Sequence, residues 1–186
     1  MRRLIVTAFI TADGAIEAPG GGDHRSTGWT FKTVEFDEAA YEIKDREQKE
    51  ATALLIGRRT YEEFAPVWPT MEEFGEYNAM PRYVVSSTLE HDDPQWPATI
   101  LRSLDEVAAL KQTEGGPILV HGSAELGANL ADAGLVDRYH LLVFPVLLGA
   151  GKRLFSASDK DLTRLQLVEH EAYSNGVIKL VYDVVH

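Results

Sequence analysis

Short apolar runs alternate with helix-type segments along the first 146 residues of the chain. The runs are rich in β-branched residues and lack helical spacing, which is typical of buried strands. This alternation predicts an α/β fold in which helices cover both faces of a mostly parallel central sheet. The predicted strands span residues 3–10, 53–56, 82–86, 99–101, 117–121 and 136–146, and the predicted helices span residues 37–51, 60–64, 105–112 and 123–133.

The remainder of the chain breaks this alternation. Two predicted strands, residues 165–173 and 177–184, follow one another with Asn175-Gly176 between them, and this dipeptide is a strong hairpin signal. An antiparallel hairpin is therefore expected at one edge of the sheet. Two stretches rich in Gly or Pro are expected to be irregular, namely residues 18–29 and residues 65–81, the latter with a short helix around 71–79.

Composition narrows the classes of function. The 186 residues, 45% hydrophobic and 25% charged, fit a single globular domain over residues 1–186. The lack of cysteine excludes disulfides and thiolate zinc sites, so we expect a cytoplasmic protein without a metal. The net charge of −11 argues against nucleic-acid or anionic-membrane binding, and no apolar stretch approaches the ~20 residues that cross a bilayer. A small anionic ligand, held by a few local cations, stays compatible with this charge.

The end of the predicted strand at residues 53–56 has the features of an anion site. Gly57 lets the backbone turn tightly, and the helix start after it offers free N–H groups and a partial positive charge. Arg58 and Arg59 add cations with bidentate geometry, and Thr60 either caps the helix or bonds a phosphate oxygen. An ordinary capped helix with two solvated arginines explains the same residues, so this segment alone leaves both interpretations open.

Two further strand ends carry related features. Ser86 and Ser87 place hydroxyl groups after a buried strand, where they suit a ribose phosphate or an ordinary polar turn. Gly122 and Ser123 lead at once into a helix, which allows close approach of a pyrophosphate, although the G-x-G-x-x-G fingerprint is absent. Because ligands gather at the carboxyl ends of parallel strands, the three ends together predict one rim that suits an adenine dinucleotide phosphate. His121 is expected to be a core or wall histidine.

With two more motifs, these strand ends resemble a known family. The motifs are Thr11-Ala12-Asp13-Gly14 after the first strand and PVLLGAGKRLF at residues 145–155, and all five occur in order over nearly the whole chain. The chain resembles the RibD C-terminal domain, the reductase domain of riboflavin biosynthesis, in a stand-alone form. The resemblance implies a three-layer αβα dihydrofolate-reductase-like fold with a mixed, mostly parallel sheet, frequently a homodimer, and NADPH as the hydride donor.

The motifs also suggest individual roles. Asp13 is the candidate for proton transfer or substrate binding, with a turn-forming aspartate before Gly14 as the alternative. Trp29, to stack on a flat ring, and Gly149 and Gly151, to line the pocket, are further substrate-binding candidates, with core packing or a plain strand connection as their alternatives. The residues expected to bind the cofactor are Thr11, Gly14, Gly57, Arg58, Arg59, Thr60, Ser86, Ser87, Gly122, Ser123, Ala124, Glu125 and Leu126.

The activity implied by the resemblance is NADPH-dependent reduction of a small heterocyclic or carbonyl substrate, similar to that of 5-amino-6-(5-phosphoribosylamino)uracil reductase. Gly122-Ser123 stands where dihydrofolate reductases proper carry a double glycine. No single acid in the corresponding stretch, the Gly-rich loop and then Trp29 to Glu42, aligns with their pterin-facing carboxylate. Asp37, Glu38 and Glu42 are the candidates there, with a solvated helix face as the alternative for each. A dihydrofolate or pterin reductase is the alternative enzyme. A non-catalytic NADPH-binding module and a structural homodimer with a vestigial pocket are the alternatives outside the enzymes.

Overall fold

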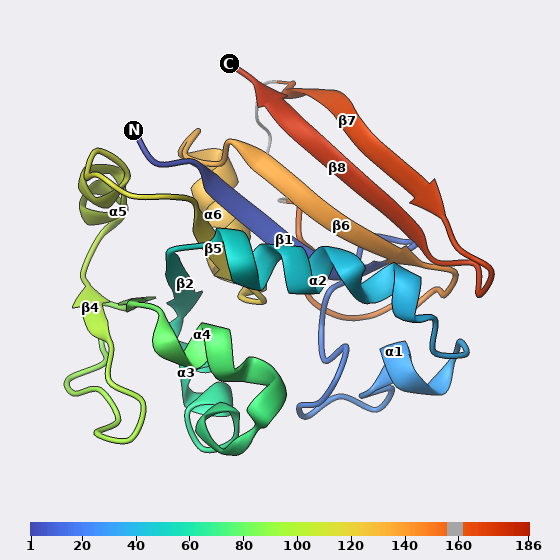
Figure 1. Cartoon of the computed structure of the whole chain (residues 1–186), viewed down its shortest axis with the longest axis horizontal. Coiled ribbons are helices and arrows are strands. Elements are labelled where there is room, and N and C mark those ends of the chain that lie inside the picture. The colour runs from blue at the N-terminus through green and yellow to red at the C-terminus, as the bar shows by residue number, and fades with distance from the viewer. Residues whose placement is uncertain (156–161) are drawn as a thin grey trace.

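The computed structural model describes residues 1–155 and 162–186, and its centre is an eight-stranded sheet (Figure 1). The strand order is β4-β3-β2-β5-β1-β6-β8-β7. The first six strands in this order are parallel, whereas β8 is antiparallel to both β6 and β7. The strands are β1 (Leu4–Thr11), β2 (Ala53–Gly57), β3 (Arg82–Val85), β4 (Thr99–Leu101), β5 (Ile118–His121), β6 (Arg138–Phe144), β7 (Arg164–Ala172) and β8 (Ile178–Val185).

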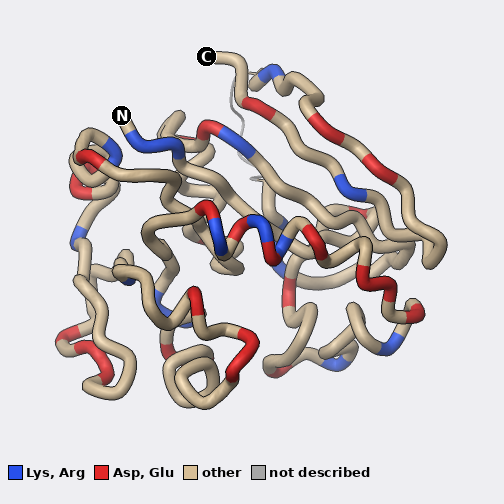
Figure 2. The backbone as a smooth tube through the Cα atoms, in the orientation of Figure 1, with Lys and Arg blue, Asp and Glu red and all other residues tan. Residues whose placement is uncertain are grey.

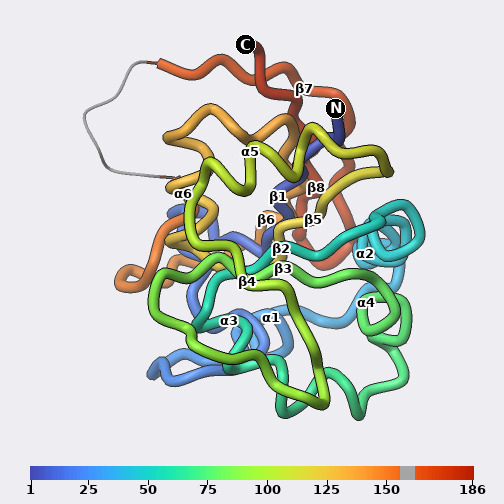
Figure 3. Tube along the Cα trace, turned by 90° about the vertical axis from the view of Figure 1, so that its left-hand side faces the viewer, coloured from blue at the N-terminus to red at the C-terminus, as the bar shows by residue number. Residues whose placement is uncertain are grey.

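Helices cover both faces of this sheet, as the alternation predicts. α2, α3 and α4 pack on one face, where Ile43 and Tyr61 join clusters of strand residues, and α5 and α6 pack on the other through Val107 and Leu126. Figures 1 and 3 place both chain ends at one end of the sheet, with α1 and α3 at the opposite end. The helices are α1 (Trp29–Lys32), α2 (Glu38–Glu50), α3 (Arg58–Phe64), α4 (Gly75–Ala79), α5 (Leu104–Lys111) and α6 (Ala124–Asp132), with 3₁₀ turns at Trp68–Thr70 and Glu72–Phe74.

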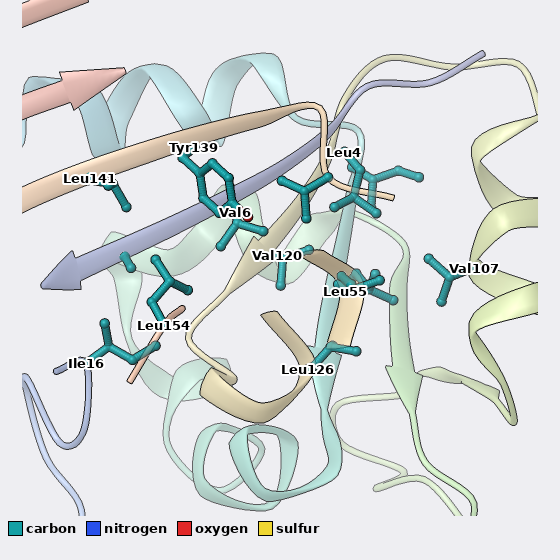
Figure 4. Packing of buried hydrophobic residues seen from close by; sticks show 14 of the residues in the cluster. Leu4, Val6, Ile16, Leu55, Val107, Val120, Leu126, Tyr139, Leu141 and Leu154 are labelled. Atoms are coloured by element: carbon teal, nitrogen blue, oxygen red, sulfur yellow. The ribbon is translucent and has the colours of Figure 1, made fainter. Parts of the chain in front are cut away.

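β1 is buried on both of its faces. Leu4 and Val6 point toward α6 and belong to a cluster that includes Leu126 (Figure 4), while Ile5 and Phe9 alternate with them and pack on the α2 side. Leu4 and Val6 have no exposed surface, and full burial of such a side chain contributes about 1.5–3 kcal/mol. Burial on both faces explains why the strand reads as a continuous apolar run rather than as an alternating one.

The C-terminal hairpin forms where the sequence predicts it. The Tyr173 N–H donates to the Val177 carbonyl at 2.9 Å, and Gly176 in the turn has a φ of 86°. β8 lies between β6 and β7, so β7 is the edge strand of the sheet.

Capping side chains begin two of the helices. Asp37 accepts the Ala39 N–H at 3.1 Å at the start of α2. Ser103 accepts the Glu106 N–H at 3.3 Å at the start of α5. Each bond satisfies one of the N–H groups that a helix start leaves without an intrahelical acceptor.

Three boundaries differ from the prediction. α3 begins at Arg58 rather than at residue 60, and Gly57 is its N-cap residue, so the expectation that Thr60 caps this helix is wrong. The stretch predicted as loop ends at Trp29, which begins α1 and buries its indole in the core. The strand predicted over residues 136–146 is confined to β6, because the chain turns at Pro145.

α2 carries charges of both signs along most of its length (Figure 2). Lys44 and Glu47 are nevertheless buried on the side of α2 that faces the sheet. Within residues 1–155 and 162–186, no helix is long and apolar enough to span a membrane.

Candidate functional site

β5 and β1 are neighbouring parallel strands, and the chain that leaves them continues toward opposite edges of the sheet. From β1 the chain crosses one face of the sheet through α2 to β2, and from β5 it crosses the other face through α6 to β6. In open α/β sheets, ligands bind at the carboxyl ends of strands where connections diverge in this way. β5 ends at His121, beside Thr7, whereas β1 continues to Thr11. Phe9 and Thr11 therefore have no strand neighbour on the β5 side, and we call this place the β1 step.

Two helices begin near the β1 step without a capping side chain. α3 follows Gly57 at the end of β2, and α6 follows Ser123 after β5, and neither N-cap residue makes a side-chain hydrogen bond to its helix. The first N–H groups of a helix have no intrahelical acceptor and carry a partial positive charge. Two such helix starts at one sheet edge form a wall suited to an anion.

The Ser123 hydroxyl joins these two helix starts. It accepts the Gly57 N–H at 2.8 Å and donates to Thr60 Oγ1, also at 2.8 Å. Gly122 and Ser123 both have left-handed backbone, with φ values of 61° and 62°. A Cβ atom on Gly122 would approach Thr60 Cγ2 to 3.3 Å. These contacts make one packed corner from segments that are far apart in the sequence.

Arg58 and Arg59 lie on the surface at the start of α3. Arg58 Nη1 is 3.1 Å from Glu62 Oε1, and the two side chains are 41% and 48% exposed. An exposed pair at this i,i+4 spacing contributes only about 0.3–0.5 kcal/mol, so it competes weakly with a bound anion. Arg59 is exposed as well. Both cations therefore stand at the helix start where the sequence places them.

Ser86 and Ser87 have different surroundings. Ser86 is buried, and its hydroxyl oxygen accepts the N–H groups of Thr88 at 3.2 Å and Leu89 at 2.9 Å, which favours a turn-forming role. Ser87 is exposed. Arg102, directly after β4, donates through Nη1 to the carbonyls of Ser86 at 3.0 Å and Leu89 at 2.7 Å. Sequence reasoning missed Arg102, although a basic residue directly after a strand at this edge was the signal that could have found it.

The Asp13 carboxylate is held by groups from two segments. It accepts hydrogen bonds from Thr11 Oγ1 at 2.5 Å, from the Gly149 N–H at 2.9 Å and from the Leu148 N–H at 3.1 Å. These bonds, with that of Thr11 the largest cause, lower the pKa of Asp13 to about 2. The carboxylate is therefore ionised at neutral pH, which favours the turn-forming role over proton donation.

The same contacts bring the loop after β6 beside the turn after β1. The Arg153 guanidinium donates to the Asp13 carbonyl, and its Nη2 lies 3.8 Å from the Asp13 carboxylate. Gly149 and Gly151 have φ values of 75° and 136°, and a Cβ atom on Gly151 would approach Leu148 Cδ2 to 3.1 Å. Both candidate glycines thus belong to a loop that is fastened to Asp13.

Trp29 and Thr11 are two more of the candidate residues that lie in the interior. Trp29 is 2% exposed, donates through Nε1 to the Glu17 carbonyl at 2.8 Å and meets the Phe144 ring edge-on, at 5.3 Å between centroids. These contacts favour core packing over stacking on a substrate. Thr11 is also buried, and its hydroxyl accepts the Ala15 N–H at 2.9 Å while donating to Asp13.

The comparisons with known proteins agree with this architecture. The family model described as the RibD C-terminal domain matches residues 2–179. The chain belongs to the RibD C-terminal domain family. Uncharacterized protein YyaP of Bacillus subtilis strain 168 is 28% identical over 188 residues, which cover 97% of this chain and 94% of YyaP.

Solved structures share the fold of this RibD C-terminal domain protein. A putative riboflavin biosynthesis protein from Shewanella sp. PV-4 superposes with a TM-score of 0.78 at 19% identity over 99% of each chain. A pyrimidine reductase-like protein from Corynebacterium diphtheriae gives 0.68 at 16% identity, over 100% of this chain and 92% of that one. A deaminase/5-amino-6-(5-phosphoribosylamino)uracil reductase from Thermotoga maritima gives 0.67 at 15% identity, over 99% of this chain and 57% of that one. These likenesses confirm the expected dihydrofolate-reductase-like fold.

Proposed function

We propose that this protein is an NADPH-dependent reductase that transfers a hydride to a small heterocyclic or carbonyl substrate. The observation that carries the proposal is the pair of uncapped helix starts, α3 and α6, joined through Ser123 at the switch point of the sheet. Membership of the RibD C-terminal domain family supports it, since that domain is the reductase of riboflavin biosynthesis.

Residues at the strand ends would hold the cofactor. The N–H groups at the starts of α3 and α6 would bind the pyrophosphate, with Arg58 and Arg59 beside them. Ser87 and Arg102 would bind the 2′-phosphate, because Ser87 is exposed and the loop carbonyls engage only Nη1 of the Arg102 guanidinium. Bound NADPH supplies the hydride, and the protein supplies binding and orientation.

Titration with NADPH and with NADH, followed by quenching of tryptophan fluorescence, tests cofactor binding. The double variant Ser87→Ala/Arg102→Ala should weaken NADPH binding by at least about 100-fold, since hydrogen bonds to charged groups contribute about 1.5–3 kcal/mol each. NADH binding should change far less. Arg164→Ala, on the edge strand β7, is the control and should alter neither affinity. Equal weakening for the two cofactors would show that the 2′-phosphate lies elsewhere.

Oxidation of NADPH across a panel of aminopyrimidines, pterins and small carbonyl compounds tests the reaction. Turnover of a pterin, with tight binding of methotrexate-like inhibitors, would indicate the dihydrofolate or pterin reductase instead. NADPH binding without oxidation by any compound would indicate a cofactor-binding module. Failure of the protein to bind NADPH would refute the proposal as a whole.

We also propose that the protein is a homodimer. The edge strand β7 carries Leu167 and Val168, which are 46% and 49% exposed, and unpaired apolar edges of this kind favour association. Light scattering should give twice the monomer mass of 20.6 kDa, and Leu167→Lys should shift the population toward the monomer. A monomeric wild type at micromolar concentration would contradict this proposal without affecting the cofactor site.

A further inference from the structure

A row of polar side chains crosses the sheet beneath α2. In the register of the parallel strands, Thr7 on β1 lies between His121 on β5 and His140 on β6. Lys44 and Glu47 reach this row from α2, since Lys44 donates a hydrogen bond to the Thr7 hydroxyl and that hydroxyl donates to Glu47. The row includes the last residue pair between β1 and β5, so it lies directly before the β1 step.

Glu47 is the centre of the hydrogen bonds. Its Oε1 accepts from Thr7 Oγ1 at 2.7 Å and is 2.9 Å from His140 Nδ1, and its Oε2 is 3.3 Å from Lys44 Nζ. The side chain is only 1% exposed. Burial raises the pKa of Glu47, but the Lys44 charge and the hydrogen bonds from His140 and Thr7 outweigh it and lower that pKa to about 2. A buried carboxylate that is ionised in this way fixes a cation beside it.

Lys44 uses only part of its donor capacity in these contacts. Its ammonium has three N–H groups, and those contacts are with Glu47 Oε2 and Thr7 Oγ1. The nitrogen also lies 4.9 Å from the centre of the Phe9 ring. Phe9 is the first residue of β1 beyond the end of β5 whose side chain lies on the α2 side of the sheet, so this ammonium stands at the β1 step.

Unpaired polar atoms gather around the same cluster. Within residues 1–155 and 162–186, His121 Nδ1, His140 Nε2 and the Tyr77 hydroxyl are buried without a hydrogen-bond partner. The Tyr77 ring lies 5.5 Å from the His121 ring, measured between centroids. Buried polar atoms are nearly always paired in folded proteins, so a group of three indicates that this region meets polar atoms of a ligand.

Reduction of a C=O or C=N bond needs a proton as well as a hydride. Asp13 is ionised at neutral pH and cannot supply the proton. His121 is neutral there, because burial and then the Lys44 charge lower its pKa to about 4. Among the described residues, Lys44 places a cationic N–H donor at the β1 step, and its contacts with Thr7, Glu47 and Phe9 fix its position.

We propose that Lys44 donates the proton in this reduction and that Thr7, Glu47 and His140 hold it in position. The inference rests on the proposed function. As the hydride adds to the electrophilic carbon, the π electrons move to the oxygen or nitrogen, which forms a bond to a proton of Lys44 Nζ while that N–H bond breaks. Lys44 is left neutral and regains a proton from solvent. Its lost positive charge offsets the one that hydride transfer leaves on the nicotinamide.

The first test needs no substrate. Side-chain ¹⁵N NMR of the lysines follows each ammonium group, and Lys44→Met identifies the Lys44 signal. Saturating NADP⁺ brings a positive ring next to Lys44 and should shift that signal, whereas the signal of exposed Lys49 on the same helix should stay unchanged. An unchanged Lys44 signal with NADP⁺ bound overturns the inference, while failure of NADP⁺ and NADPH to bind overturns the proposed function.

The second test measures turnover with the substrate that the panel identifies. Lys44→Met should lower kcat by at least about 100-fold and leave the Kd for NADPH within about twofold. Lys49→Met is the matched control and should keep the wild-type kcat. Because Lys44→Met leaves Glu47 without its cation, the neutral variant Lys44→Met/Glu47→Gln provides a second measurement, with the same loss expected. More than about 1% of the wild-type kcat in either variant would overturn the inference, whereas NADPH binding without turnover by the wild type would overturn the proposed function.

Discussion

Substitutions of Ser123 measure two opposing contributions to stability at the corner between β5 and α6. The hydrogen bonds of its side chain stabilise the fold, and its left-handed backbone destabilises it. The hydroxyl accepts the Gly57 N–H and donates to Thr60, each at 2.8 Å. Ser123→Ala removes both hydrogen bonds and leaves the partly buried Gly57 N–H without this acceptor. A lost bond of this kind costs about 0.5–1.5 kcal/mol and an unsatisfied donor about 1–3, so the free energy of unfolding should fall by about 2–3 kcal/mol.

Ser123→Gly removes the same bonds but also relieves the backbone. The φ of 62° costs a residue with a side chain about 1–2 kcal/mol. The greater freedom of glycine in the unfolded chain lowers stability by about 0.4–1 kcal/mol, which offsets part of the relieved strain. The glycine variant should therefore be about 1 kcal/mol more stable than the alanine variant, and about 1–2 kcal/mol less stable than the wild type.

Urea unfolding followed by circular dichroism measures these differences, and thermal unfolding should reproduce them as about 2–4 °C per kcal/mol in a chain of this size. Ser87→Ala is the control, because Ser87 is exposed and its loss should change stability by less than about 0.5 kcal/mol. Equal stability of the alanine and glycine variants would refute the strain at Ser123. Wild-type stability of the alanine variant would refute the importance of the two hydrogen bonds.

Two further predictions concern titratable groups. The folded chain holds the pKa of His121 at about 4, below the 6.5 of an unperturbed histidine, chiefly through burial. Between these two pKa values the unfolded chain is protonated at His121 and the folded chain is not. The free energy of unfolding should therefore fall by at most about 3 kcal/mol as the pH is lowered from about 7 to about 4. His121→Phe should flatten this part of the urea-midpoint profile, and an unaltered slope would contradict the assignment. Asp13→Asn should speed proteolytic cleavage in the loop at residues 148–151, because it removes the ionised acceptor of the Leu148 and Gly149 N–H groups. Exposed Glu35→Gln serves as its control, and equal cleavage rates in the two variants would show that Asp13 does not fasten the loop.

Most of the sheet could be predicted because burial on both faces leaves its parallel strands almost wholly apolar, as in Leu4–Thr11. Helix α1 could not be predicted, since the four residues Trp29–Lys32 give too little periodicity to register as a helix. The early start of α3 follows from Gly57, whose extended backbone serves as N-cap without a side chain. Local signals therefore fixed the type of each long element, and contacts between segments decided the boundaries.

The candidate site was predictable where it depends on strand ends. Gly57 and Ser123 were expected at one rim because parallel strands bring their carboxyl ends together, and the structure joins them by a hydrogen bond. Lys44 and Glu47 could not be recognised, because charges of both signs along α2 resemble a solvated helix face. Only the register of Thr7 with residues more than 100 positions later in the chain creates the polar row that Lys44 and Glu47 meet.

The position of β8 has a consequence for synthesis of the protein. β8 is made after β7, yet it lies inside the sheet and pairs with β6 through residues Ile178 to Asp183. Until those residues leave the ribosome, one side of β6 carries backbone N–H and C=O groups that lack their strand partner. Open strand edges on incomplete chains are sites of aggregation. The interval between the synthesis of β6 and that of β8 is therefore the stage at which the nascent chain is most open to association through this sheet edge.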